Sequence, residues 1–218
     1  MKLRLLAATI LLSPILLATP LKAENAQQLE QLLETKQCSG CNLNQAWLKK
    51  ADLIEANLSQ STLIDTNLTK ANLQRANLQG AKLRRAILKR ADLNQANLSR
   101  TGLLQANLRK AFLVDVDLRH ADLRHANLQQ VKLWNADLRE TNLRNADLRK
   151  AILTNASLSQ ADLNKADLRD AVLNRTALDG ANLRGAKLSS TTLVNALLCN
   201  TTLPDGAVSN RDCALLGS

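Results

Sequence analysis

Leucine recurs at every fifth position from Leu43 to Leu203, and this pattern dominates the chain. All 33 positions of the series are leucine, with no substitution and no change of phase. Two residues before each leucine stands a small residue, which is alanine at 23 of the 33 positions. The residue directly before the leucine is Asp or Asn at 18 of them. The strict period predicts one structural unit of five residues, repeated along most of the chain.

Neither a helix nor a straight strand accounts for a period of five. In an α-helix five residues advance about 500°, so successive leucines would scatter around the axis. In a strand the side chains alternate between faces, so successive leucines would point to opposite sides. Both difficulties disappear if the chain turns a corner once per unit, because each leucine and the small residue before it then face inward. We therefore expect a short extended piece followed by a corner in every unit.

Corners that all bend the same way close the chain into coils. Four units make a square coil of 20 residues, and the next coil stacks on it at the strand spacing of about 4.8 Å. The 33 units predict about eight such coils. Each coil buries four leucines, and each leucine contributes about 1.5–3 kcal/mol. The sequence thus predicts an all-β solenoid with leucine and alanine inside and the polar residues outside.

The units also resemble those of a known family. Four that match its A(D/N)LXX consensus are Ala51-Asp52-Leu53, Ala71-Asn72-Leu73, Ala121-Asp122-Leu123 and Ala166-Asp167-Leu168. This consensus is that of the pentapeptide-repeat proteins, and the resemblance covers about three quarters of the chain. It implies a right-handed quadrilateral parallel β-helix, and the handedness follows from the family alone. The family is abundant in cyanobacteria, and most members have no assigned activity.

The segment before the repeat predicts a signal peptide and then a cap. Residues 1–23 have a basic start followed by a short apolar run, which is typical of a secretory signal. The alternative is an uncleaved anchor, but the run is shorter than the roughly 20 apolar residues that span a bilayer. Residues 24–40 predict a capping helix and a Cys loop, with Leu29, Leu32 and Leu33 at helical spacing over the first coil.

The solenoid is expected over residues 41–203 and a C-terminal cap over residues 204–218. Pro204-Asp205-Gly206 marks a turn directly after the last leucine of the series. Ser209 or Asn210 then stands where the N-cap of a short helix is expected. Leu215 and Leu216 in that helix would cover the last coil.

Four cysteines lie close to the two ends of the predicted rod. In an exported protein disulfides are the expected state, and four cysteines allow three pairings. Cys41 and Cys199 belong to opposite ends of the solenoid, whereas a disulfide needs Cα atoms within about 7 Å. Only Cys38–Cys41 and Cys199–Cys213 are then compatible with one chain. Asn42 follows the C-x-x-C motif where haem attachment requires histidine.

Composition excludes several chemical functions. The chain carries one Phe and two Trp, which is few for a globular core but suits a core of Leu and Ala. The two histidines, His120 and His125, have no nucleophile or acid beside them, and Asp and Asn follow the repeat rather than forming a catalytic pair. We find no Gly-rich phosphate loop, nucleophile elbow or metal-ligand cluster. The expectation is therefore no enzyme activity, no cofactor and no metal.

Two neighbouring faces of the predicted square rod differ from the others. The first is basic, and its cations are Lys49, Lys50, Lys70, Lys89, Arg90, Arg109, Lys110, Arg149 and Lys150. The second is apolar on the outside, and its residues are Phe112, Val114, Trp134, Ile152, Val172 and Val194. A basic face attracts anionic surfaces, although it also keeps a rod soluble. An exposed apolar patch suggests a protein partner or a dimer contact, although these residue types also favour β structure.

Two functions follow, and both place the protein outside the cytoplasm, in the periplasm or the thylakoid lumen. In the first, the rod is a non-catalytic interaction or scaffold protein whose apolar face binds an unknown protein or a second copy. In the alternative, the basic face binds an anionic membrane or a cell-wall polymer. The net charge is +10, and +7 without residues 1–23. DNA mimicry of the kind that some acidic, cytosolic family members perform is therefore not expected of this basic chain, and nucleic acid is not an expected partner outside the cytoplasm.

Overall fold

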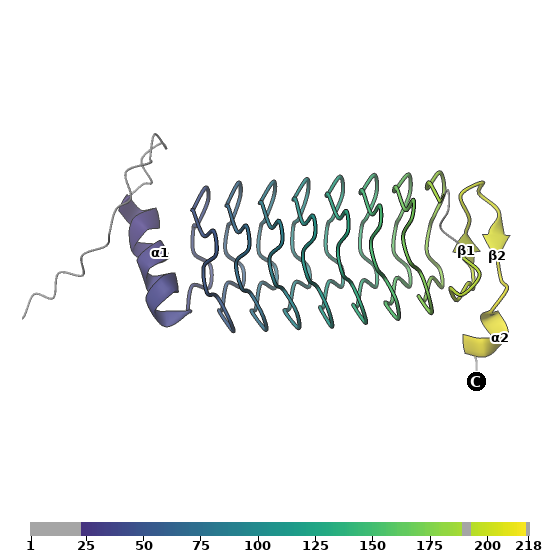
Figure 1. Cartoon of the computed structure of the whole chain (residues 1–218), viewed down its shortest axis with the longest axis horizontal. Helices are drawn as coiled ribbons and strands as arrows, with labels where there is room; N and C mark the ends of the chain where they lie inside the picture. Colours follow the sequence, from purple (N-terminus) through teal and green to yellow (C-terminus); the bar gives the residue numbers. More distant parts are fainter. Residues whose placement is uncertain (1–22, 189–192, 217–218) are drawn as a thin grey trace, which may run out of the picture.

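The computed structural model describes residues 23–188 and 193–216 and shows a straight rod of stacked coils (Figure 1). Helix α1 (Ala23–Thr35) closes one end of the rod, and strands β1 (Thr201–Thr202) and β2 (Val208–Ser209) with helix α2 (Cys213–Leu216) close the other. The signal peptide predicted for residues 1–23 lies outside the described residues except for Ala23. No helix in the described ranges combines the length and the apolar character that crossing a bilayer would need.

Neighbouring coils are in register at a separation of 20 residues. Asn57 pairs with Asn77, and Asn77 with Asn97, through parallel bridges. From Leu43 to Leu168, the backbone amide of each leucine in the series donates to the carbonyl of the residue 19 positions later, as Leu98 does to Asp117 at 2.7 Å. Four five-residue units therefore make one coil, as the period predicts. The backbone ladder joins each coil to the coils above and below it.

Each corner is a β-turn that begins at the leucine. The amide of Ala46 donates to the carbonyl of Leu43 at 3.1 Å, and Gln45, the third residue of this turn, has a φ of 61°. A β-turn in which only the third residue has a positive φ is a type II turn. Glycine stands there at Gly80, but most corners use a longer polar residue, at a conformational cost of about 1–2 kcal/mol each.

The Asp and Asn residues before the leucines stabilise these corners. The side-chain Oδ1 of Asn67 accepts a hydrogen bond from the backbone amide of Thr69 at 3.0 Å, and Asp162 does the same for Asn164 at 3.0 Å. Short carboxylate and amide side chains are suited to this bond with the residue two positions later. Their frequency in the repeat therefore reflects turn geometry.

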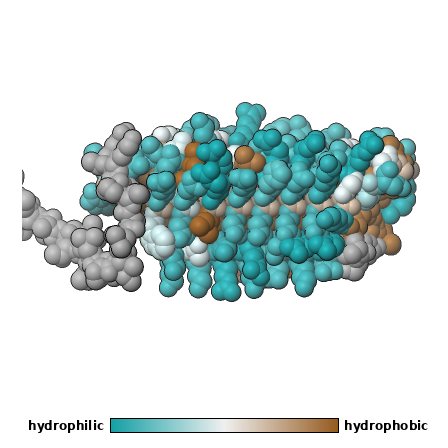
Figure 2. Space-filling model, turned by 90° about the horizontal axis from the view of Figure 1, so that it is seen from above, coloured by the Kyte–Doolittle hydropathy of each residue, from teal (hydrophilic) through white to brown (hydrophobic). Residues whose placement is uncertain are grey.

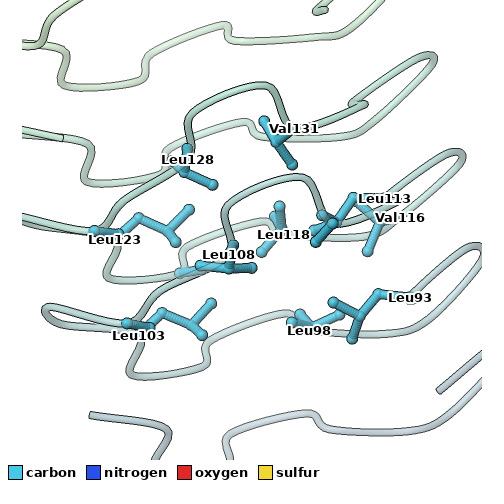
Figure 3. Close-up of a cluster of buried hydrophobic side chains, with 14 of the residues drawn as sticks. Leu93, Leu98, Leu103, Leu108, Leu113, Val116, Leu118, Leu123, Leu128 and Val131 are labelled. Carbon is cyan, nitrogen blue, oxygen red and sulfur yellow. The ribbon is translucent and has the colours of Figure 1, made fainter. Parts of the chain in front are cut away.

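The interior of the rod is a column of leucine and alanine. Leu103 and Ala106 are fully buried, and the close-up in Figure 3 shows leucines of successive units pointing into the coil. Threonine replaces alanine at some small positions and stays hydrogen-bonded, since the Thr176 hydroxyl donates to the Leu153 carbonyl at 2.8 Å. A buried hydroxyl without a partner would cost about 1–3 kcal/mol, so these bonds allow polar residues in the core.

Helix α1 lies across the first coil, but its contact face differs from the prediction. Leu32 is fully buried in the core and Leu29 is partly buried, whereas Leu33 is 48% exposed. Leu33 lies about 100° around the helix from Leu32, which turns it away from the coil. The prediction that all three leucines cover the first coil was therefore wrong for Leu33.

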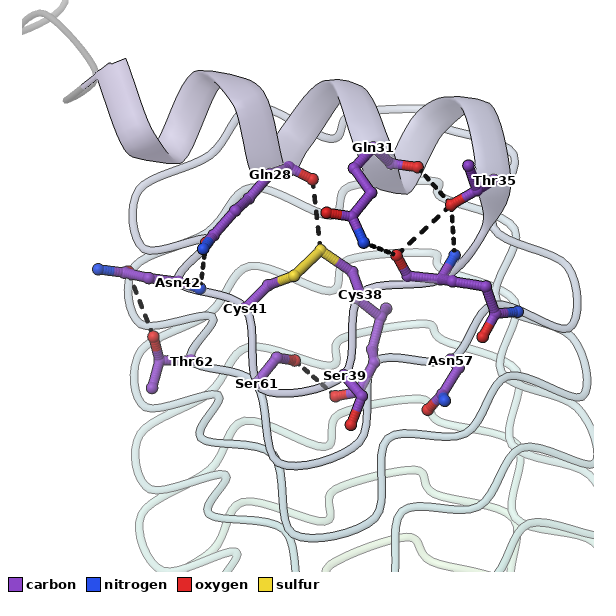
Figure 4. The surroundings of a disulfide bond; sticks show 12 residues. Gln28, Gln31, Thr35, Cys38, Ser39, Cys41, Asn42, Asn57, Ser61 and Thr62 are labelled. Carbon is purple, nitrogen blue, oxygen red and sulfur yellow. Dashed lines mark hydrogen bonds between the residues drawn. A yellow bond between two sulfur atoms is a disulfide. The ribbon is translucent and has the colours of Figure 1, made fainter.

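The N-terminal cap is fixed by a disulfide and by two glutamine side chains (Figure 4). Cys38 and Cys41 are buried and bonded, with Cα atoms 5.3 Å apart. The Gln31 side chain donates to the Gln37 backbone carbonyl at 2.9 Å, and the Asn42 backbone amide donates to the side-chain oxygen of Gln28 at 2.7 Å. These contacts hold the helix at one angle across the open coil.

The C-terminal cap combines a short hairpin, whose two strands have two residues each, with a second disulfide. Strand β2 pairs antiparallel with β1, and Cys199 is bonded to Cys213 across 4.7 Å between Cα atoms. The predicted N-cap residues Ser209 and Asn210 do not directly precede a helix, because α2 begins at Cys213. Ser209 belongs to β2, and the Asn210 side chain accepts a hydrogen bond from the Asn200 backbone amide at 2.9 Å. The side chains of Leu215 and Leu216 lie outside the described residues.

Candidate functional site

Ion pairs neutralise many of the charges on the rod. Where Asp precedes the leucine and Arg follows it, the two side chains meet side by side, as in Asp122 and Arg124 with N–O distances of 2.8 and 2.7 Å. The same arrangement occurs in Asp117–Arg119, Asp137–Arg139, Asp147–Arg149 and Asp167–Arg169. We did not predict these pairs, although the Asp-Leu-Arg triplet marks each of them. Arg149, predicted as part of the basic face, is bound to Asp147 instead.

These pairs lower the pKa of their carboxyl groups. Hydrogen bonds from Arg169 hold the pKa of Asp167 below its ordinary value, although partial burial of the carboxyl acts in the opposite direction. Arg124 lowers the pKa of Asp122 in the same way, and Arg119 that of Asp117. The carboxylates are therefore held in the charged form more strongly than in the unfolded chain.

We expect these pairs to make the rod less stable in acid. Because the folded-state pKa lies below the unfolded value of about 3.9, their stabilisation is complete above roughly pH 4 and is lost as the pH falls below it. Replacing Asp117, Asp122 and Asp167 together by Asn keeps the turn-capping oxygen and removes the pairs. Chemical unfolding at pH 7, 4 and 2.5 should show a shallower acid decline in this variant, and an unchanged slope would contradict the assignment.

One corner of the rod keeps its positive charge. We call it the cationic ridge, and it consists of Lys49, Lys50, Lys70, Lys89, Arg90, Arg109 and Lys110. Within the described ranges, none of these seven side chains lies within 4.0 Å of a carboxylate oxygen. Five of them and Thr69 line one surface hollow of about 400 Å³. These seven cations of the predicted basic face therefore keep their charge available.

Two apolar side chains accompany the ridge on the same face. Trp47 is 67% exposed, and the Lys49 ammonium lies 5.9 Å from the centre of its ring. Ile87, two coils further along, is 37% exposed. Tryptophan with most of its surface in contact with water is unusual in a monomeric soluble protein.

The neighbouring face carries the second surface, which we call the aromatic patch. It consists of Phe112, Val114, Lys132, Trp134, Ile152 and Val172. Phe112, Trp134 and Val172 are each 38% exposed. The Lys132 ammonium lies 4.7 Å from the centre of the Phe112 ring and 5.4 Å from that of Trp134, so it sits against both aromatic rings. The predicted apolar strip is thus interrupted by a cation.

The two surfaces meet in a hollow of about 440 Å³. Phe112 and Ile152 form its apolar part, and the remaining lining residues are Arg90, Lys110, Gln130, Lys132 and Lys150. No acidic residue lines this hollow. Elsewhere the exterior is largely hydrophilic, as the face in Figure 2 shows, with hydrophobic side chains scattered among rows of hydrophilic ones.

The geometry offers no obvious catalytic arrangement in the described part of the chain. There, no group of three or more His, Cys, Asp and Glu side chains is placed to hold a metal ion. The His120 Nδ1 lies 3.2 Å from the Glu140 carboxylate one coil later, which leaves it in a surface pair. The surfaces that remain as candidate sites are the aromatic patch and the cationic ridge.

Comparison with known proteins identifies the repeat. The profile of the family described as pentapeptide repeats matches in 8 copies, over residues 37–75, 71–103, 103–135, 135–170 and 166–203. The chain belongs to the pentapeptide-repeat family. Pentapeptide repeats imply a right-handed quadrilateral β-helix, and proteins built from them are typically non-enzymatic structural or interaction proteins.

Solved pentapeptide-repeat structures are similar to this chain. HetL, from the cyanobacterium Nostoc sp. strain PCC 7120 and involved in the regulation of heterocyst differentiation, is 34% identical, with 79% of this chain and 81% of HetL covered and a TM-score of 0.47. Rfr23, from the cyanobacterium Cyanothece 51142, is 28% identical, with 67% of this chain and 97% of Rfr23 covered and a TM-score of 0.31. A pentapeptide-repeat protein from the thylakoid lumen of Arabidopsis thaliana is 23% identical, with 72% of this chain and 69% of that protein covered and a TM-score of 0.17. Among curated protein sequences, none matches.

Proposed function

We propose that this protein is a non-catalytic docking rod that acts outside the cytoplasm, in the periplasm or the thylakoid lumen. Its aromatic patch binds a protein partner whose contacting segment is acidic and carries apolar side chains. The observation that carries this proposal is the acid-free hollow in which Phe112 and Ile152 lie beside four cations. The rod holds this surface rigidly, because every coil is hydrogen-bonded to its neighbours.

The patch has the composition of a binding surface. Exposed aromatic side chains offer a large apolar area at low entropic cost, and Trp and Arg are frequent in binding hot spots. Lys132 contacts both rings in the free protein, so a partner carboxylate approaching this ammonium would bring its apolar neighbours onto Phe112 and Trp134. Charge complementarity therefore favours an acidic partner over a second copy of this basic chain.

Location outside the cytoplasm is supported by the cysteines. All four are in disulfides, Cys38 with Cys41 and Cys199 with Cys213. Structural disulfides persist in oxidising compartments and are rare in the cytosol. The signal peptide predicted for residues 1–23 also supports a location outside the cytoplasm.

Site-specific photo-cross-linking tests the docking surface. A benzophenone amino acid is placed at position 112 or 134 and, as a control, at position 104. Leu104 is a partly buried leucine at a corner of the opposite face. In the cells that produce the protein, we expect positions 112 and 134 to cross-link one common acidic protein, and position 104 to give none of it.

A charge substitution then tests the contact itself. Trp134→Glu should reduce the yield of that cross-link from position 112 on the order of 30-fold, since losing an aromatic hot spot costs about 2 kcal/mol or more. A matched Leu104→Glu variant should cross-link from position 112 as the wild type does. Equal yields from all three positions, or a cross-link only to a second copy of the chain, would overturn the proposal.

A further inference from the structure

We propose that the cationic ridge, together with Trp47 and Ile87, is a membrane-binding surface that takes the headgroups of anionic lipids. This surface lies on the face next to the aromatic patch, and the inference does not rest on the protein partner proposed above. A rod bound in this way would lie along the membrane, and the two surfaces share Arg90 and Lys110 at the hollow where they meet.

The face that carries the ridge is electrically asymmetric along the rod. From residue 47 to residue 110 its outward and corner positions hold seven basic residues and no acidic residue. From residue 127 to residue 170 the same positions hold three basic and three acidic residues. In that second half, Arg149 and Arg169 are bound to Asp147 and Asp167. Positive charge is therefore concentrated in the N-terminal half of one face.

Acidic residues on the neighbouring faces do not neutralise the ridge. Asp52 lies 3.6 Å from the Lys36 ammonium, and Asp65 is bound to Arg85 on the other edge of the face. Asp92 accepts hydrogen bonds from the Gln74 side chain and from the Asn94 amide. Each nearby carboxylate thus has a partner outside the ridge, and the ridge cations stay free to bind an external anion.

The solenoid arranges these cations in a line. Residues 20 apart stack on one another, so the ridge spans four coils, or about 15 Å at strand spacing. Five of its side chains surround the hollow of about 400 Å³, where an anionic group can meet several cations at once. Each lysine or arginine close to an anionic membrane adds roughly a fivefold gain in affinity.

The exposed apolar side chains favour a membrane over a soluble polyanion. Tryptophan is enriched at the level of the lipid headgroups, where its ring is partly buried and its N–H stays hydrated. Lysine and arginine extend along the same boundary and keep their charges at the headgroups. Trp47, at 67% exposure beside Lys49, and Ile87 on the same face fit that boundary. A hydrated polyphosphate or anionic glycan would leave both without an apolar environment.

Vesicle co-sedimentation at low salt tests this surface. The full chain is compared with its variants on phosphatidylglycerol–phosphatidylcholine vesicles, so any affinity from residues 1–22 is common to all. Lys50→Gln/Arg90→Gln/Lys110→Gln should weaken binding on the order of 100-fold, from about fivefold per cation. Glutamine is tolerated at these corners, since Gln105 and Gln130 occupy the same position with φ of 58° and 57°.

A matched variant controls for net charge. Arg100→Gln/Lys165→Gln/Arg175→Gln removes three cations from corners of the same geometry outside the ridge, and its affinity should stay close to wild type. Equal losses in the two triple variants, or no binding to anionic vesicles at low salt, would overturn the proposal. High salt should release the wild type, because exposed charges are then screened.

Tryptophan fluorescence separates a membrane from a soluble polyanion. In a Trp134→Phe background Trp47 is the sole tryptophan, and its emission should shift to shorter wavelength on anionic vesicles. Neutral phosphatidylcholine vesicles and inorganic polyphosphate should leave the spectrum unchanged. Ridge-dependent binding of polyphosphate as tight as that of vesicles, with no shift of Trp47 on either, would replace the membrane assignment by a polymer-binding one.

Discussion

Leu103→Ala is expected to lower the free energy of unfolding by about 2–5 kcal/mol, while Leu104→Ala should change it by less than about 1 kcal/mol. Leu103 is fully buried inside its coil, whereas Leu104, the next residue, is only partly buried at the corner. The two variants lose the same atoms one position apart. They therefore separate burial from every other property of the side chain.

The large value for Leu103 follows from the stiffness of the coil. The Leu103 amide donates to the Asp122 carbonyl at 2.7 Å, so the backbone around the leucine is held by the next coil. A wall fixed in this way cannot move inward to fill the space left by alanine, and the cost of a core substitution grows with the cavity that remains. Denaturant unfolding followed by circular dichroism gives the comparison. Similar losses for the two variants would contradict a leucine-filled interior.

Leu32→Glu is expected to release α1 from the first coil and to make the protein self-associate, whereas Leu33→Glu should behave like the wild type. Leu32 is fully buried and Leu33 is 48% exposed, although they are consecutive residues of one helix. Burial of Leu32 contributes about 1.5–3 kcal/mol, and a carboxylate without a partner in its place carries a further penalty of desolvation. The helix avoids that penalty by lifting away.

A lifted cap would expose the leucines and the open backbone edge of the first coil. Solenoids without a polar cap associate through such ends, and an unpaired strand edge is a template for further pairing. Light scattering after size exclusion measures the mass, and limited proteolysis of residues 23–35 measures the release of α1. If Leu32→Glu keeps the wild-type mass and the wild-type resistance to protease, the capping role of Leu32 is wrong.

The repeat itself could be predicted because each unit obeys the same local rule. Leucine at every fifth position predicts one corner per unit, and the bridges at 20-residue intervals have the register of the predicted four-sided coil. The Asp-Leu-Arg ion pairs were not predicted, although both partners belong to one unit. The disulfides Cys38–Cys41 and Cys199–Cys213 followed from the length of the rod, which separates the other combinations.

Contacts between side chains of different units could not be predicted from the repeat. Lys132 contacts Phe112 from the next coil, and it turned an apolar strip into a patch with a cation at its centre. The helical spacing of Leu29, Leu32 and Leu33 was correct as an amphipathic pattern. Which of the three meets the coil depends on the angle of the helix, and contacts such as Gln31 with Gln37 set that angle.

The sequence by itself determined the coil, its register and the inward position of each leucine, because a five-residue period acts within one unit and admits one regular arrangement. The tertiary structure alone decided which charges stay unpaired, which aromatic rings share a cation and how each end is closed. The first two outcomes depend on side chains 18 to 20 residues apart, such as Arg144 with Asp162 and Lys132 with Phe112, that meet only once the coils have stacked. The surfaces that carry the proposed functions belong to this second group.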